Sequence, residues 1–474
     1  MTNIDAVLRH LDADFDGAVA RLTEFLRIPS VSTDPARAGE VRRAAHWIAD
    51  QLAALDFSVS LVETARHPTV IAQHPGTPGG LDGGVRDGVP PHILYYGHYD
   101  VQPPEPLEEW TTDPFDPTII DGPHGKRIVA RGAVDDKGQV MTFIEALRAW
   151  HAVHGGPPTR VTVLIEGEEE IGSANLAATL EAERDRLGAD ICVVSDTTGW
   201  DVDTPALTTR LRGMLYTELY VEGPGHDLHS GLYGGVAPNP LNALTRVLGR
   251  LHDDQGRVAI DGFYDDVRDP DPETLAAWAA LPQDDEAVMA EIGADGLDGE
   301  QGVSRLERLW SRPTCDINGI SGGYAGAGSK TVIPARASAK VSFRLVPDQD
   351  PDRILAAYKV FIAQTLPSAC RWRLEVHSKS TGVEVDTGQP MMAAARAALE
   401  QVYGRPAAPI GCGGSIPVVG MMRRLLGIDT ILMGFGLDDD RMHSPNEKFE
   451  LRALANGARS HAAFLGKVAE GSGL

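Results

Sequence analysis

Histidine or acidic residues follow strand-like apolar segments or flank glycines at widely spaced places in this chain, and this recurrence is its most restrictive feature. The first is residues 97–101 (GHYDV), which follow the apolar run 92–96 (HILYY). Further runs occur at residues 135–136, 166–170, 196 and 443–447. In an open α/β sheet, side chains at the carboxyl ends of the strands meet in one crevice. We therefore predict that these distant segments build one pocket.

The residue types in these runs are those that bind divalent cations. Imidazole and carboxylate groups suit zinc or manganese as nitrogen and oxygen ligands. The run 166–170 (EGEEE) crowds four carboxylates at the end of an apolar strand, where they repel one another unless a cation compensates them. Metal-assisted hydrolysis needs both metal ligands and a general base for water. The pattern predicts a two-metal hydrolase site.

Each residue also has a simpler interpretation. A single histidine such as His98 is more often a satisfied core residue than a ligand. Asp100, two positions later, changes the balance because a carboxylate there can hydrogen-bond the far ring nitrogen and fix the tautomer. Asp135 or Asp136 could be the N-cap of the helix that follows. A bridging carboxylate needs similar anchoring, so the two interpretations are compatible.

The order of expected elements indicates two domains in 474 residues. Strands and helices alternate up to about residue 208 and again from about residue 379. The middle differs, because residues 214–221 and 340–346 alternate like half-buried antiparallel strands between helical stretches. We predict an α/β fold in which an open mixed-sheet catalytic domain (1–208 and 379–474) carries an inserted α+β lid or dimerisation domain (209–378). The Gly- and Pro-rich residues 75–91 are predicted to form a surface loop.

The net charge and the cysteine content argue against several classes of binding partner and of site. The formal net charge of −24 argues against binding to nucleic acid and to anionic membranes. The four cysteines are widely scattered, which disfavours a disulfide framework or a thiolate metal site. No secretory signal and no run of 18 apolar residues is visible, so we expect a cytoplasmic protein without membrane spans.

The motifs together resemble the aminoacylase-like two-metal peptidase family, and most closely its cytosolic nonspecific dipeptidase and carnosinase branch. The matching runs occur in family order across nearly the whole chain. They are residues 97–101 (GHYDV), 131–138 (RGAVDDKG), 168–173 (EEEIGS), 227–235 (DLHSGLYGG), 329–334 (SKTVIP), 343–347 (FRLVP), 413–417 (GGSIP) and 443–447 (HSPNE).

The resemblance implies two divalent ions per subunit. Zinc is the expected metal, with manganese or cobalt as alternatives. Asp135 would bridge the two ions and would be followed by a cis peptide bond. His98 and Asp196 would complete one site, and Glu170 and His443 would complete the other.

The resemblance also implies roles in catalysis. Glu169 would be the general base, and Asp100 would support His98. His229, in the inserted domain, would reach the active site of the partner subunit in a homodimer and help to stabilise the oxyanion.

Four further residues would bind the substrate. Arg344, Lys330 and Thr331 would meet its carboxylate end, and Ser415 would also contact it. One departure concerns residues 411–412 (GC), because the dipeptidase branch usually has Arg-Glu there; this puts the usual dipeptide preference in doubt.

We therefore expect a metal-dependent protease of the dipeptidase type that cleaves dipeptides or similar short amides with a free carboxylate. The alternative within the family is a deacylase of N-acetyl or N-succinyl amino acids. A non-catalytic metal-binding protein is a third interpretation, against which Glu169 speaks, because it is neither a ligand nor an obvious structural residue.

Overall fold

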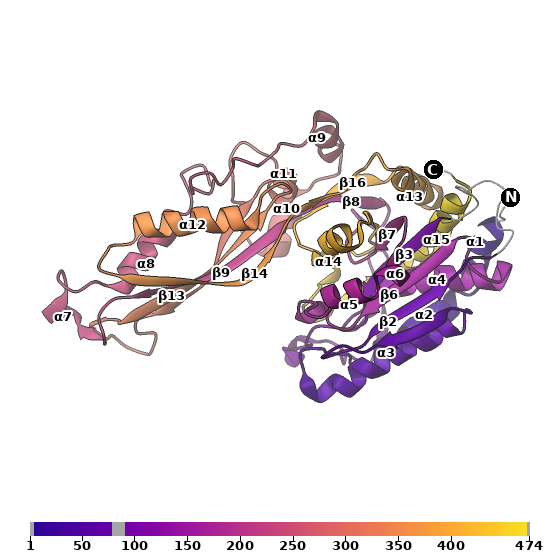
Figure 1. Cartoon of the computed structure of the whole chain (residues 1–474), viewed down its shortest axis with the longest axis horizontal. Coiled ribbons are helices and arrows are strands. Elements are labelled where there is room, and N and C mark those ends of the chain that lie inside the picture. Colours follow the sequence, from indigo (N-terminus) through magenta and orange to yellow (C-terminus); the bar gives the residue numbers. More distant parts are fainter. Residues whose placement is uncertain (1–3, 78–90, 472–474) are drawn as a thin grey trace. The chain divides into compact units, whose positions relative to one another are not determined.

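The computed structural model describes residues 4–77 and 91–471, and the chain forms two compact units (Figure 1). The first unit contains Met1–Thr209, Val385–Ile410 and Met421–Leu474, and the second contains Arg210–Glu384 and Gly411–Gly420. Most of the loop predicted at residues 75–91 lies outside the described residues. None of the described helices is both long enough and apolar enough to cross a membrane.

A mixed sheet organises the first unit. Its central strand β3 is parallel to both β6 and β7, whereas β1 and β2 are antiparallel. β3 is buried along its whole length, as expected for a parallel strand covered on both faces. The strand order is β1 (Ser58–Val62), β2 (Thr69–His74), β6 (Arg160–Glu166), β3 (His92–His98), β7 (Ile191–Val194), β17 (Thr430–Leu432), β8 (Ala206–Leu211) and β15 (Val383–Glu384), with β16 (Ala408–Cys412) also paired to β8.

Helices cover this sheet, and α4 and α15 are its central supports. Tyr95 on β3 stacks against Phe143 on α4 with ring centroids 4.0 Å apart. Trp150 on α4 donates a hydrogen bond from Nε1 to the carbonyl oxygen of Ala462 on α15 (3.0 Å). The α-helices of the unit are α1 (Ile4–Ala13), α2 (Phe15–Leu26), α3 (Ala38–Ala53), α4 (Lys137–His154), α5 (Leu176–Ala182), α6 (Arg184–Leu187), α13 (Pro390–Tyr403) and α15 (Leu451–Ala469).

A small antiparallel sheet joins segments that are far apart in the sequence. It consists of β4 (Thr118–Gly122), β5 (Gly125–Val129) and β18 (Lys448–Glu450), with β5 in the middle. Lys448 pairs with Val129. This pairing brings residues 443–447 beside the turn that begins at residue 130.

The second unit is built on a four-stranded antiparallel sheet. β9 alternates buried and half-buried residues along its length, as its sequence predicts. The strand order is β11 (Thr314–Gly322), β13 (Arg336–Leu345), β9 (Gly213–Glu222) and β14 (Arg371–Ser380). The other elements are β10 (Leu228–His229), α7 (Ser230–Tyr233), α8 (Pro240–Leu248), α9 (Pro272–Ala279), α10 (Asp285–Ile292), α11 (Arg305–Trp310), β12 (Val332–Ile333) and α12 (Pro351–Thr365).

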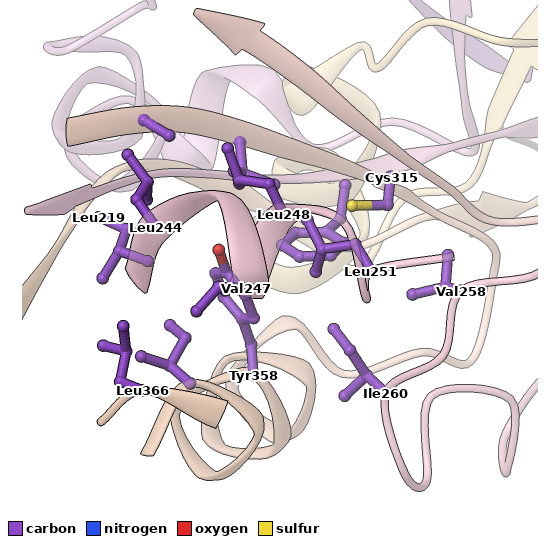
Figure 2. Packing of buried hydrophobic residues seen from close by; sticks show 14 of the residues in the cluster. Leu219, Leu244, Val247, Leu248, Leu251, Val258, Ile260, Cys315, Tyr358 and Leu366 are labelled. Carbon is purple, nitrogen blue, oxygen red and sulfur yellow. The ribbon is translucent and has the colours of Figure 1, made fainter. Parts of the chain in front are cut away.

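The core of the second unit lies between this sheet and helices α8 and α12. Figure 2 shows Leu244, Val247 and Leu248 of α8 in a cluster with Leu219 of β9 and Tyr358 of α12. All five side chains are at least nine-tenths buried. Because this core involves no residue of the first unit, the second unit has a hydrophobic core of its own.

The predicted class, α/β with an open mixed sheet and an inserted α+β part, is confirmed. Residues 4–27 form two helices separated at Asp14, and α14 (Pro417–Met421) is followed by a π-helical turn, Met422–Leu426. The strands β4, β5, β8, β11 and β14 were not predicted. The first four lack a regular alternation of polar and apolar residues. In β14, Trp372, Leu374 and Val376 do alternate with polar residues, so this strand was missed in spite of its pattern.

Candidate metal centre and active site

His98 is the last residue of β3, which is a central strand of the sheet. It is fully buried, opposite Glu166 of the parallel strand β6. Its backbone nitrogen donates to Asp136 Oδ2 (3.2 Å). The preceding residue, Gly97, leaves no room for a side chain, because a Cβ atom there would lie 2.6 Å from Val140 Cγ2 and 2.8 Å from Asp136 Oδ2. Close packing between β3 and the start of α4 therefore places His98 beside Asp135.

Buried Glu447 holds the turn that presents Asp135. Its carboxylate accepts hydrogen bonds from the backbone nitrogens of Gly132 (2.8 Å), Val134 (2.9 Å) and Asp135 (3.1 Å). It also accepts one from Arg131 Nη1 (2.8 Å). The peptide bond between Asp135 and Asp136 is cis, as the resemblance implied. In the sequence, Glu447 stands out only as the last residue of the run 443–447; its contact with the turn depends on the β5–β18 pairing.

The four glutamates at the end of β6 and in the residues that follow it divide into two pairs. Glu166 accepts hydrogen bonds from Tyr96 Oη (2.6 Å) and Ser173 Oγ (2.9 Å). Glu168 accepts from Thr64, from the backbone nitrogen of His67 and from Asn175. The carboxylates of Glu166 and Glu168 are therefore already bound by hydrogen-bond donors of the protein itself.

The other two glutamates, Glu169 and Glu170, lie in a short 3₁₀ turn, Glu169–Ile171. The carboxylate of Asp100 accepts hydrogen bonds from both of their backbone nitrogens, at 3.3 and 3.1 Å. Gln102 Nε2 donates to Glu170 Oε2 (2.6 Å), but the buried Oε1 of Glu170 has no hydrogen-bond partner. Asp100 thus orients the turn that carries both glutamates.

Asp100 also contacts His98, through its backbone oxygen as well as through the expected carboxylate. His98 Nδ1 lies 3.0 Å from the backbone oxygen of Asp100 and 3.4 Å from its Oδ1. The backbone oxygen is the closer acceptor for a proton on Nδ1. With Nδ1 protonated, Nε2 carries the lone pair that can face a metal ion.

Two groups of possible ligands share Asp135. In the first, His98 Nε2 is 3.0 Å from Asp135 Oδ1 and 4.0 Å from Asp196 Oδ2. In the second, His443 Nε2 is 2.8 Å from Asp135 Oδ2 and 3.4 Å from Glu170 Oε2. Each oxygen of Asp135 therefore faces a different histidine. The structure brings together all five side chains that the sequence analysis selected as metal ligands.

The charges of these groups are poorly balanced in the protein alone. Burial raises the pKa of Glu170 to about 10, that of Glu169 to about 8 and that of Asp196 to about 6, with further repulsion from neighbouring carboxylates. Burial opposes ionisation of Asp135 as well, but hydrogen bonds from His443 and His98 outweigh it and lower the pKa of Asp135. The site thus holds more carboxylates than its two histidines can neutralise.

This arrangement fits two divalent cations. The donors are imidazole nitrogens and carboxylate oxygens, which suit zinc, manganese or cobalt. Glu170 Oε1 is buried and without a partner, as expected for an atom whose partner is an ion. The side chain of His443 is 56% exposed, so the second group can be reached from solvent.

The five other predicted site residues belong to the second unit. His229 pairs with Val332 across β10 and β12, and the backbone nitrogen of Ser230 donates to the carbonyl oxygen of Thr331 (3.0 Å). The neighbouring Lys330 is exposed. His229, Lys330 and Thr331 therefore lie close together, at or just before the paired strands β10 and β12.

Arg344 and Ser415 form a separate pair in the second unit, with Arg344 Nη1 donating to Ser415 Oγ (3.3 Å). Ser415 Oγ in turn donates to the backbone oxygen of Arg212 (2.5 Å). Arg212 was not selected from the sequence, because a lone arginine at the start of a strand carries no distinctive signal.

Comparison with known proteins gives a consistent result. Residues 94–467 match the family described as peptidase family M20/M25/M40. The chain is 31% identical to Cys-Gly metallodipeptidase DUG1 of Saccharomyces cerevisiae, over 98% of each chain. It is 30% identical to human Beta-Ala-His dipeptidase, over 98% of this chain and 93% of the relative. The solved structure of an M20 family metallo-carboxypeptidase, Sso-CP2 from Sulfolobus solfataricus, is similar with a TM-score of 0.82 and 31% identity, covering 95% of this chain and 99% of that one.

The shared position of Asp135 predicts the effect of removing its carboxylate. We expect Asp135→Ala to lose both metal ions, because each oxygen of Asp135 faces one of the two groups. The matched control is Asp196→Ala, which leaves Asp135, Glu170 and His443 in place and should keep about one ion per chain. Metal analysis of the purified proteins measures both. One ion retained at normal affinity by Asp135→Ala would contradict the shared ligand.

The raised carboxyl pKa values predict how metal binding depends on pH. In the metal-free protein, the folded pKa values of Glu169, Glu170 and Asp196 exceed their unfolded values. The stability that these groups contribute is therefore fully present below about pH 4 and is lost as the pH rises through the folded values. Metal ions compete with protons for the same oxygens.

We therefore expect saturating zinc or manganese to raise the melting temperature by roughly 5–10 °C at pH 8, and by less at pH 5.5. The reference is the chelated protein at each pH, so that groups outside the site cancel. Scanning calorimetry of the four samples measures the difference. Equal increments at both pH values would show that these carboxylates do not take up protons when the metals leave.

Proposed function

Because this chain belongs to peptidase family M20/M25/M40, we propose that it is a metal-dependent hydrolase that cleaves dipeptides with a free carboxylate. The observation that carries the proposal is the pair of ligand groups around Asp135, with Glu169 beside them. The names of the relatives support dipeptides as substrates: one is a Cys-Gly metallodipeptidase and another a Beta-Ala-His dipeptidase. They do not favour the alternative of an N-acyl-amino-acid deacylase.

The proposed metal ligands are His98, Asp135 and Asp196 for one ion and Asp135, Glu170 and His443 for the other. When bound, two such ions supply Lewis acidity and lower the pKa of water at the site. Zinc is the proposed metal, and manganese and cobalt are the alternatives to test. The proposed place of action is the cytoplasm.

Glu169 is the proposed general base. It lies next to a ligand in the turn Glu169–Ile171, and Asp100 holds its backbone nitrogen. Among the described residues it has no ion pair within 4.0 Å, so its carboxylate is available for proton transfer. Burial raises the pKa of Glu169 to about 8. A carboxylate with a pKa near neutral pH can take a proton from water and later give it to the leaving amine. A non-catalytic metal-binding protein would have no use for this residue.

The second unit is the proposed lid and dimerisation domain, corresponding to residues 209–378 of the predicted division. His229 is exposed, and its Nδ1 accepts a hydrogen bond from the backbone nitrogen of Gly231 (2.9 Å), which leaves Nε2 as the donor. Beside it, Leu232 and Val236 are 76% and 84% exposed. An exposed apolar group of this kind is typical of a surface covered by another protein. The proposed partner is a second copy of this chain.

In this proposal, His229 of one subunit donates a hydrogen bond to the oxyanion that develops in the partner's active site. Arg344, Lys330, Thr331 and Ser415 are the proposed contacts for the rest of the substrate. The positive charges of Arg344 and Lys330 suit a substrate carboxylate.

The proposal predicts that Glu169→Gln lowers kcat by about a hundredfold or more, because loss of a general base has effects of this size. Metal content and melting temperature should stay near those of the unchanged protein. The assay is hydrolysis of Cys-Gly, β-Ala-His and N-acetylated amino acids with zinc, manganese or cobalt. The control is Glu166→Gln, whose carboxylate is bound to Tyr96 and Ser173. Full activity in Glu169→Gln would require another base.

A subunit-mixing experiment tests the dimer. His229→Ala and Glu169→Gln should each be nearly inactive alone. After random subunit exchange, half of the dimers are mixed, and each has one site with both residues intact, so about a quarter of the original activity should return. Exchange is verified by mass spectrometry of tagged chains. If exchange occurs without recovery, His229 does not act across the dimer.

A further inference from the structure

Arg212 and Arg344 form a pair of neighbouring cations in the second unit. Arg212 is only 8% exposed. Its Nε donates to the carbonyl oxygen of Gly413 (3.0 Å), and its own backbone oxygen is linked through Ser415 Oγ to Arg344 Nη1. Across the described residues, neither guanidinium has a carboxylate oxygen within 4.0 Å. Asp316 attracts Arg212 from beyond ion-pair distance, so the pair carries a positive charge that no direct ion pair among the described residues balances.

The loop 411–415 (GCGGS) encloses Arg212 but brings it no charge. A Cβ atom on Gly413 would lie 2.9 Å from Arg212 Nη2. A Cβ atom on Gly411 would lie 2.4 Å from the Cβ of Trp310, which packs edge-on against Trp278. A side chain at residue 411 would therefore clash with the base of the Trp310 side chain, whereas one at residue 413 would displace only the flexible end of Arg212. Cys412 accepts a hydrogen bond from the backbone nitrogen of Gly414 (3.3 Å) and contributes no acidic group.

Electrostatics indicates that this place favours an anion. Burial, and then repulsion by Arg344, lower the pKa of Arg212 to about 10. A desolvated cation beside a second cation is costly, and an anion that bonds to both relieves the cost. Arginine binds carboxylates through two parallel hydrogen bonds, so two guanidiniums can accommodate two carboxylates.

We propose that Arg212 determines specificity: together with Arg344 it forms a site for two carboxylates, so that the enzyme prefers dipeptides whose C-terminal residue is aspartate or glutamate. This inference rests on the proposed dipeptidase function. One carboxylate is the chain terminus of the substrate and the second is the side chain of its last residue. A neutral side chain would leave one of the two cations without a counter-charge.

The test compares Ala-Glu with Ala-Gln, which have nearly the same shape and differ in charge. We expect kcat/KM to be about tenfold or more higher for Ala-Glu, since hydrogen bonds to charged groups have effects of this size. Arg212→Met should reduce this ratio to about one, mainly through KM for Ala-Glu, and Arg212→Lys should restore part of it. A ratio of one or less in the unchanged protein would overturn the proposal.

A second pair of variants does not alter Arg212 itself. Cys412→Glu adds a carboxylate beside the guanidinium and should lower the Ala-Glu to Ala-Gln ratio at least threefold. The matched control Cys412→Ser keeps an acceptor for the Gly414 nitrogen and should retain the original ratio. Equal ratios in the glutamate and serine variants, together with no effect of Arg212→Met, would also overturn the proposal.

Binding separates this proposal from the proposed function. Calorimetry on the manganese-loaded protein should show tighter binding of L-glutamate than of L-glutamine, and Arg212→Met should abolish the difference. If the protein hydrolyses no dipeptide, the dipeptidase proposal fails and this binding difference decides the inference alone. If it hydrolyses Ala-Gln and Ala-Glu equally and binds both amino acids equally, only the inference fails.

Discussion

The shared carboxylate of Asp135 is the interaction on which the site depends. Its two oxygens lie 3.0 and 2.8 Å from the ring nitrogens of His98 and His443, residues that come from opposite ends of the sequence. A carboxylate can face two partners in this way only if its backbone is held. Glu447 provides that support through hydrogen bonds to three backbone nitrogens of the same turn.

The surrounding carboxylates favour the binding of cations at this site. Glu170 and Asp196 are buried at the edge of the sheet, where ionisation is unfavourable without a positive partner. The neighbouring Glu166 and Glu168 avoid this conflict because hydroxyl, amide and backbone donors bind them. The same acidic run thus contains two structural residues and two residues suited to metal chemistry. This division gives Glu169 and Glu170 their separate proposed roles.

The second unit has the opposite electrostatic character near its proposed substrate contacts. Arg212 and Arg344 form no direct ion pair among the described residues, and the loop 411–415 contacts both of them. The proposed division of labour follows from these charges. In that proposal the first unit, rich in carboxylates, would hold cations, and the second would offer guanidinium groups to the anionic end of a substrate.

The sequence by itself determined the class of fold and selected the five candidate metal ligands, because these depend on local motifs. Apolar runs predicted β3, β6 and β7, and the candidates His98, Glu170 and Asp196 lie at or just after the ends of these strands. The strands β4, β5 and β11 escaped prediction because their residues lack a regular alternation, whereas β14 alternates and was missed in spite of it. Only the tertiary structure decided which glutamates are bound by other protein groups, that Glu447 supports the Asp135 turn, and that Arg212 has no direct ion pair among the described residues. These facts depend on contacts between residues far apart in the chain, such as the pairing of Lys448 with Val129, and no local pattern encodes which distant groups will meet.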